Sequence, residues 1–75
     1  MITDEEVEEL CLDMVHTLDA ERRQRGVRES DIEDVMGINR GTWYAILKHG
    51  RCRLATLILA AEGLGYSVRL VKRDR

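Results

Sequence analysis

The sequence predicts a small, mainly α-helical domain that contains one helix-turn-helix, and three observations support this prediction. Apolar residues recur at helical spacing in four segments of the chain. Glycines stand where these segments are expected to end. The chain has 75 residues, of which 44% are hydrophobic and 35% charged, as expected for one globular domain over residues 1–75 with a small core.

The first predicted helix spans about residues 4–25. Thr3 and Glu6 match the capping-box pattern for a helix start, and Gly26 can end the helix. The apolar stripe of this helix comprises Val7, Leu10, Cys11, Met14, Val15 and Leu18. The stripe is either core, or a surface for a second copy or a protein partner. His16 falls off the stripe, so we expect it to face solvent and to bind no metal.

Residues 30–50 contain the predicted helix-turn-helix. Ser30 and Glu33 form a second capping-box pattern, Gly37 can make a tight turn, and Asn39 can cap the next helix, over about residues 40–49. The buried face of that helix is expected to hold Trp43, Ile46 and Leu47. The opposite face is polar and partly basic, as a helix that enters the major groove of DNA requires.

The fourth predicted helix spans about residues 53–63 and is followed by a change of periodicity. Its inward residues are expected to be Leu54, Leu57, Ile58, Ala61 and Leu64. Tyr66, Val68 and Leu70 then alternate with other residues, which predicts one β-strand over about residues 66–73. Because a lone strand is unstable, we expect these three residues to pair with the same strand of a second copy in a homodimer.

Charge is divided unevenly along the chain. Residues 1–34 hold 12 acidic and 4 basic side chains, and residues 35–75 hold 2 acidic and 8 basic, which gives −8 and +6 within the total of −2. Nucleic-acid binding needs a basic face and not a basic total, so this division allows it.

The location of the protein is expected to be cytoplasmic and nucleoid-associated, with no membrane contact. No apolar run approaches the ~20 residues of a membrane span. The acidic start, MITDEEVEEL, is unlike a signal peptide. Cys11 and Cys52 are far apart in the sequence, so we expect reduced thiols, with a bridge between them as the alternative.

The segment from about Leu18 to Leu64 resembles the lambda-repressor-like (Cro/Xre) helix-turn-helix family. The letters RRQRGVRESDIEDVMGINRGTWYAILKHG follow that family's Arg-rich end of the first helix and its hydrophobic-Gly-hydrophobic turn. The resemblance implies a four-helix domain that binds DNA. Small antitoxins and phage regulators in this family have a strand where repressors have a fifth helix.

Individual positions in this segment both follow and depart from the family pattern. Arg40, Gly41 and Ala45 stand where the family's side chains usually meet base edges. Glu29 occupies the position of a Gln that commonly contacts phosphate. The family also pairs an Arg near the end of helix 1 with a Glu in the recognition helix. Arg22 matches that Arg, but Leu47 replaces the Glu, so Arg22 is expected to seek another acid or solvent.

The predicted DNA-binding site combines one base-reading residue with a basic cluster. Arg40 can donate two hydrogen bonds to guanine, and Ala45 can touch a thymine methyl group. Lys48, Arg51 and Arg53 are expected to contact phosphates. The full set of predicted DNA-binding residues is Asn39, Arg40, Gly41, Thr42, Tyr44, Ala45, Lys48, His49, Arg51 and Arg53.

The leading functional prediction is a homodimeric, sequence-specific regulator of transcription, a repressor that binds a palindromic operator in bacterial or phage double-stranded DNA. One alternative is the antitoxin of a toxin–antitoxin pair, with a protein partner bound through helix 1. A third is a protein-interaction module that no longer binds DNA. We predict no enzymatic activity, catalytic residue, cofactor or metal, because the sequence has no nucleophile–base pair, metal-ligand cluster or phosphate loop.

Overall fold

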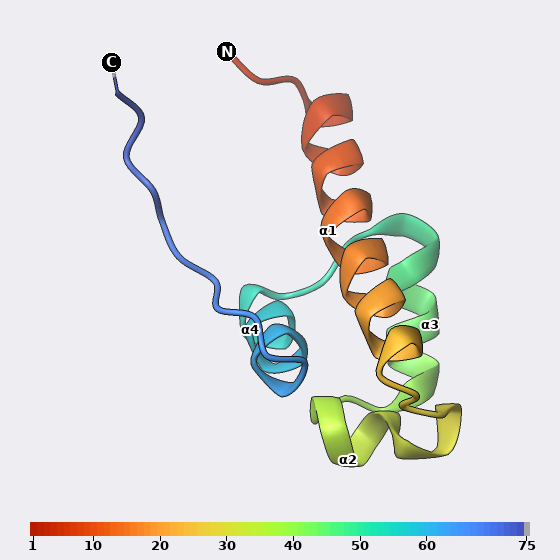
Figure 1. Cartoon of the computed structure of the whole chain (residues 1–75). Coiled ribbons are helices and arrows are strands. Elements are labelled where there is room, and N and C mark those ends of the chain that lie inside the picture. The colour runs from red at the N-terminus through yellow and green to blue at the C-terminus, as the bar shows by residue number, and fades with distance from the viewer. Residues whose placement is uncertain (75) are drawn as a thin grey trace.

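The computed structural model describes residues 1–74 and is mainly α-helical, as predicted. The elements are α1 (Asp4–Gln24), the single 3-10 turn η1 (Glu29–Asp31), α2 (Ile32–Met36), α3 (Arg40–His49) and α4 (Leu54–Gly63). α3 packs along one side of α1, α4 packs on the other side, and α2 closes one end against α4 (Figure 1). No helix among the described residues is long and apolar enough to cross a membrane.

α1 begins and ends close to the predicted bounds, and the capping box between Thr3 and Glu6 is present. The predicted apolar stripe is only partly buried. Val15 and Leu18 are in the core, whereas Val7, Leu10 and Met14 are exposed and Cys11 is half-buried. The reason is that the first turns of α1 project beyond the other helices (Figure 1). On one side those turns adjoin His49 and Arg51, which line a hollow with Asp4, Val7 and Glu8.

α2 follows a 3-10 turn, and the predicted capping box at Ser30 is wrong. Instead, η1 precedes the helix, and Asp31 stands at the N-cap without a side-chain hydrogen bond. Val35 is exposed, whereas Ile32 and Met36 are fully buried. The turn that follows agrees with the prediction, since Gly37 has a φ of +71° and the next residue, Ile38, is buried.

α4 contributes small residues to the core, which makes part of its predicted inward face wrong. Ala60 and Ala61 are buried, but Leu54 and Ile58 are exposed. The close approach of α4 to α2 explains this, because a Cβ atom added at Gly63 would collide with the backbone of α2 at Val35. Leu64 is buried and Leu57 packs half-buried against the core, as predicted.

The C-terminal tail, residues 66–74, leaves α4 through Gly65 and runs back beside α1 toward the N-terminus (Figure 1). No β-strand is formed among the residues described, so the predicted strand stays a prediction. The tail is attached at its start, where the Tyr66 hydroxyl donates to Glu21 Oε1 at 3.3 Å and Val68 packs against the core. Beyond that point Leu70 and Val71 are 104% and 85% exposed and bury nothing.

Candidate nucleic-acid interface

The N-terminus of α3 is fixed by Asn39, as the sequence predicted. The Asn39 side-chain oxygen accepts hydrogen bonds from the backbone N–H groups of Gly41 (2.8 Å) and Thr42 (3.3 Å). A Cβ atom at Gly41 would lie 3.1 Å from that oxygen, so glycine leaves room for a close cap. The cap satisfies two of the N–H groups that a helix start leaves unpaired. It thereby sets the direction in which the first turn presents Arg40.

Opposite faces of α3 differ sharply in exposure. Trp43 and Ile46 are buried, and Leu47 packs half-buried on the core. The residues exposed to solvent on α3 are Arg40, Gly41, Thr42, Ala45, Lys48 and His49. Arg40 lines a small polar hollow with Glu29 and Glu33, without forming an ion pair in the described part of the chain. The helix therefore offers an exposed guanidinium in its first turn.

Tyr44 differs from the other predicted DNA-binding residues. Its side chain is half-buried and packs against the core, at the edge of the exposed face. Burial and the neighbouring Glu29 carboxylate raise the pKa of its hydroxyl. Tyr44, which the sequence predicts to bind DNA, is therefore less accessible than the exposed residues of α3.

The predicted basic cluster comprises Lys48 and His49 at the end of α3, and Arg51 and Arg53 in the loop that leads to α4. All four side chains are exposed. Gly50, between the pairs, has a φ of +74°, and a Cβ atom there would lie 2.9 Å from the Leu12 nitrogen. The loop is thus held against α1 by a close backbone approach. The structure brings these four residues together beside the C-terminal end of α3.

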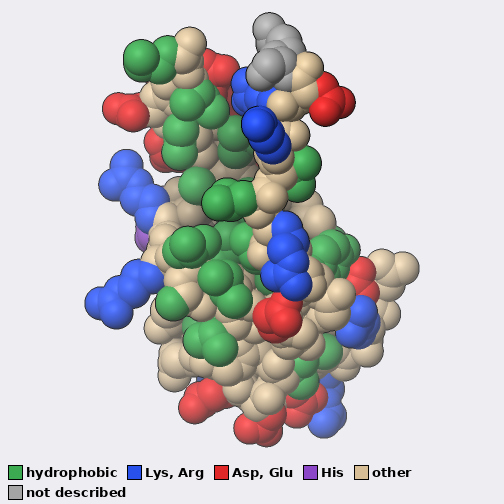
Figure 2. All heavy atoms as spheres, turned by 90° about the vertical axis from the view of Figure 1, so that its left-hand side faces the viewer, with side chains coloured by type: hydrophobic (Ala, Val, Ile, Leu, Met, Phe, Trp, Pro, Cys, Tyr) green, Lys and Arg blue, Asp and Glu red, His purple; other side chains and the backbone are tan. Residues whose placement is uncertain are grey.

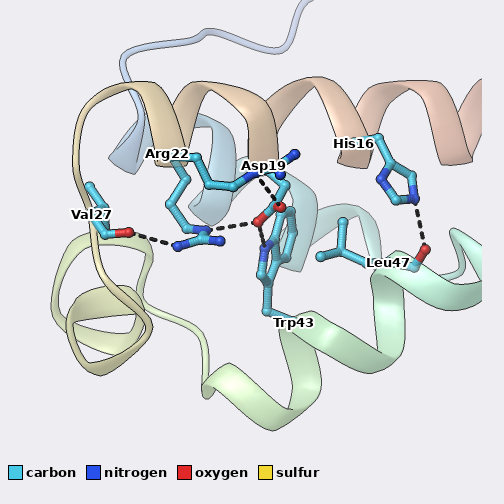
Figure 3. A network of polar contacts seen from close by, with 7 residues as sticks. His16, Asp19, Arg22, Val27, Trp43 and Leu47 are labelled. Atoms are coloured by element: carbon cyan, nitrogen blue, oxygen red, sulfur yellow. Dashed lines mark hydrogen bonds and ion pairs between the residues drawn. The ribbon is translucent and has the colours of Figure 1, made fainter.

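A contact from α1 holds the same end of α3. The His16 side-chain Nε2 lies 2.9 Å from the Leu47 carbonyl oxygen, and it must donate because a carbonyl only accepts (Figure 3). Leu47 belongs to the last turn, whose carbonyls lack partners within the helix. His16 is exposed, as predicted, but this structural role was not predicted.

A buried polar network joins α1 to α3 and to the segment that precedes η1 (Figure 3). Asp19 Oδ1 accepts hydrogen bonds from Arg22 Nε at 2.8 Å and from the Trp43 indole N–H at 2.9 Å. Arg22 also donates to the Val27 carbonyl oxygen at 2.7 Å. Arg23 Nε lies 3.4 Å from the second Asp19 oxygen. One carboxylate therefore fixes the rotation of α3 about its axis, because it holds the largest side chain of the buried face.

The electrostatics of this network favour an ionised Asp19. Burial alone would raise its pKa, but hydrogen bonds from Arg22 and Trp43, together with the charges of Arg22 and Arg23, outweigh that effect. The pKa of Asp19 consequently lies below its ordinary value of 3.8. Arg22 pairs with Asp19. This agrees with the expectation that Arg22 would bind another acid, because Leu47 replaces the glutamate of the family pattern. The sequence did not predict the role of Asp19. The available signal is that a buried tryptophan usually needs an acceptor for its N–H and that Asp19 lies three residues before Arg22.

The two cysteines are free thiols, and they line the same hollow between α1 and the loop before α4. Burial, and to a smaller degree the neighbouring Cys11, raise the pKa of Cys52. Within residues 1–74, no group of three or more His, Cys, Asp or Glu side chains is arranged to hold a metal ion.

Comparisons of the chain with protein-family models, with curated protein sequences and with solved structures find no match.

Proposed function

We propose that this protein is a sequence-specific regulator of transcription that binds double-stranded DNA as a homodimer, with α2, the Gly37 turn and α3 as a helix-turn-helix. Repression of bacterial or phage promoters through a palindromic operator is the proposed activity. The observation that carries the proposal is the division of α3 into two faces. One side buries Trp43 and Ile46, and the other exposes Arg40, Thr42 and Lys48.

In this proposal, α3 enters the major groove with its first turn foremost. Arg40 donates two hydrogen bonds to the O6 and N7 atoms of a guanine. Gly41 and Ala45 lack polar side chains, so they allow close approach of the helix, and Ala45 can contact a thymine methyl group. Lys48, Arg51 and Arg53 bind phosphates beside the groove and position the helix without reading sequence.

The distribution of charge supports the same orientation. The exposed cations Lys48, Arg51 and Arg53 adjoin the C-terminal end of α3, and His49 and Arg51 line a hollow with Asp4 and Glu8 of α1. An acidic helix is repelled by phosphate, so the phosphate contacts are expected from the basic cluster and not from α1.

Selection of bound fragments from random duplex DNA, followed by gel-shift titration of the enriched sequence, tests the proposal. We expect an inverted repeat whose half-sites lie about one DNA turn apart. Recovery of no enriched sequence would reject sequence-specific regulation and favour the interaction module that does not bind DNA.

The salt dependence of binding tests the phosphate contacts separately. Replacing Lys48, Arg51 or Arg53 by alanine should weaken binding to all DNA sequences alike. The slope of log affinity against log salt should shrink by about one unit for each phosphate that a variant no longer neutralises. Filter-binding titrations at several salt concentrations measure this slope.

A matched control for those variants is Arg25→Ala, which also removes one positive charge. Arg25 is bound to Glu21 at the far end of α1, whereas the basic cluster contacts α1 near Leu12, and 13 residues of helix span about 20 Å. Its slope should equal that of the wild type. If the slopes of the three cluster variants are also unchanged, the phosphate contacts lie elsewhere.

Antitoxin activity is the second candidate, and the exposure of Val7, Leu10 and Met14 on α1 favours it. Such an apolar surface on a helix is typical of a protein-binding site. Co-expression with a small toxic protein encoded beside this gene tests the idea. Rescue of growth that is lost in a Leu10→Lys variant would support a toxin-binding role, and toxicity that persists with the wild-type chain would reject it.

A further inference from the structure

Acidic residues of α1 and residues of the basic cluster line one hollow, which lies between the first turns of α1 and the end of α3. The hollow has a volume of about 250 Å³. α1 contributes Asp4 and Glu8 to its lining, and His49 and Arg51 line it from the other side. All four side chains are exposed, and none belongs to an ion pair among the described residues. Two carboxylates therefore lie beside part of the surface that is proposed to bind phosphate.

The backbone of the loop after α3 holds Arg51 next to these carboxylates. A Cβ atom at Gly50 would lie 2.9 Å from the Leu12 nitrogen, so the loop touches α1 there. Glu8 precedes Leu12 by four residues, which is about 6 Å along the helix. The His49 side-chain Nδ1 accepts the backbone N–H of Arg51 at 3.0 Å and fixes the start of the loop. The position of the Arg51 backbone is thus set, while its exposed side chain is free to turn.

Helical spacing divides the acids of α1 into those that line the hollow and those that do not. Asp4 and Glu8 are four residues apart and share one face of the helix. Glu5 and Glu9 have the same spacing, but they are turned by about 100° around the helix axis and do not line the hollow. Both of these glutamates are also exposed. The chain therefore contains two pairs of acids that differ in position and not in number of charges.

We propose that Asp4 and Glu8 are an autoinhibitory pair, which competes with DNA phosphate for the guanidinium of Arg51. A guanidinium can bind either anion, because carboxylates and phosphates both accept its parallel N–H donors. In the free protein, the two carboxylates attract the side chain of Arg51 across the hollow. In the complex, the side chain has to leave them in order to reach a phosphate. The first interaction therefore opposes DNA binding.

This inference rests on the DNA binding of the proposed function, and it adds two residues that limit that binding. Lys48 does not line the hollow, so its phosphate contact is not opposed in this way. The inhibition is therefore partial and acts through Arg51. Since phosphate contacts do not read sequence, Asp4 and Glu8 should lower the affinity for all duplexes alike.

Neutralising each pair of acids tests the proposal. One variant combines Asp4→Asn with Glu8→Gln, and the matched control combines Glu5→Gln with Glu9→Gln, so both lose two negative charges. In gel-shift titrations on a random duplex, the first should bind about three- to tenfold more tightly than the wild type, the effect expected of exposed opposite charges. The control should gain less than about twofold, because salt screens the more distant charges. Circular dichroism checks that both variants keep their helices.

The same substitutions in two further backgrounds show whether the effect passes through Arg51. In an Arg51→Ala chain, neutralising Asp4 and Glu8 should give no more than the small gain of the control pair. In a Lys48→Ala chain, which also lacks one cation of the basic cluster, the full gain should remain. The difference between the two backgrounds is the coupling between the carboxylates and Arg51.

Three results would overturn the autoinhibitory role while DNA binding stands. Equal gains for the two acid pairs would show an effect of net charge alone. A full gain in the Arg51→Ala chain would show that the carboxylates repel phosphate directly. Unchanged affinity after neutralising Asp4 and Glu8 would show that they do not oppose binding. A wild-type chain that binds no duplex at all would reject the proposed function, and the autoinhibitory role with it.

Discussion

Replacing Asp19 by alanine should destabilise the domain by about 3–5 kcal/mol, the usual cost of breaking a buried ion pair from one side. Asp19 and Arg22 are each only 6% exposed, and the carboxylate also accepts the indole N–H of Trp43. Without it, a buried guanidinium loses its counter-charge and a buried N–H loses its acceptor. Since a domain of this size holds about 4–11 kcal/mol in total, much of the protein should be unfolded or close to it.

Urea denaturation followed by circular dichroism measures this effect. Asp34→Ala is the matched control, because Asp34 is an exposed aspartate that forms no ion pair among the described residues, and its change should stay within about 0.5 kcal/mol. Asp19→Asn retains a hydrogen-bond acceptor without the charge and should be intermediate. A loss below about 1 kcal/mol in Asp19→Ala would show that the network does not hold α3 in place.

The same carboxylate makes stability depend on pH in a defined direction. Its pKa is lower in the folded state than its ordinary value of 3.8, so the unfolded chain binds a proton first as pH falls. The contribution of Asp19 is complete above that ordinary value and is lost as pH falls through the folded pKa. Asp19→Asn should therefore flatten the decline in the free energy of unfolding below pH 3.8. An equally steep decline in the variant would assign the acid sensitivity to other groups.

Replacing Arg40 by alanine should cost about 1–3 kcal/mol of binding to the selected site and much less on random DNA. Arg40 is exposed in the first turn of α3, directly after the Asn39 cap. Its neighbours at the other expected reading positions, Gly41 and Ala45, have no polar side chain. Under the proposed function, discrimination should be concentrated in one guanidinium, and its loss should relax the preference at one base pair in each half-site.

Two further variants separate base reading from simple attraction. Arg40→Lys keeps the charge but loses the two-pronged donor, so non-specific binding should survive better than specificity. Lys48→Ala, the control from the same helix, should weaken binding to selected and random DNA equally. Equal losses for Arg40→Ala on both DNAs would describe a phosphate contact and would remove Arg40 from the base-reading role.

The parts of the fold that follow from local rules could be predicted from the sequence. The capping box at Thr3, the Asn39 cap and the Gly37 turn depend on a few adjacent residues, and all three are present. The burial of Trp43 and Ile46 could also be predicted, because their helical spacing places both on one face of α3. These rules define α3 and its exposed face, which is most of the candidate DNA site.

The parts that depend on distances between elements could not be predicted. Helical spacing marks Leu54 and Ile58 as apolar, but their exposure follows from the close approach of α4 to α2 at Gly63. The pairing of Asp19 with Trp43 joins residues 24 positions apart, which no local pattern reveals. The strand predicted over about residues 66–73 is not formed in the described single chain, and its pairing with a second copy stays a prediction.

Titration of the isotopically labelled protein with the selected duplex, followed through its backbone amide resonances, tests most directly whether the exposed face of α3 binds DNA. We expect the largest changes in two stretches, residues 39–42 at the start of α3 and residues 48–53 at its end and in the following loop. The acidic first turns of α1 should show little change. Changes concentrated in α1 and the tail, or no change on saturation with duplex, would contradict DNA binding through α3.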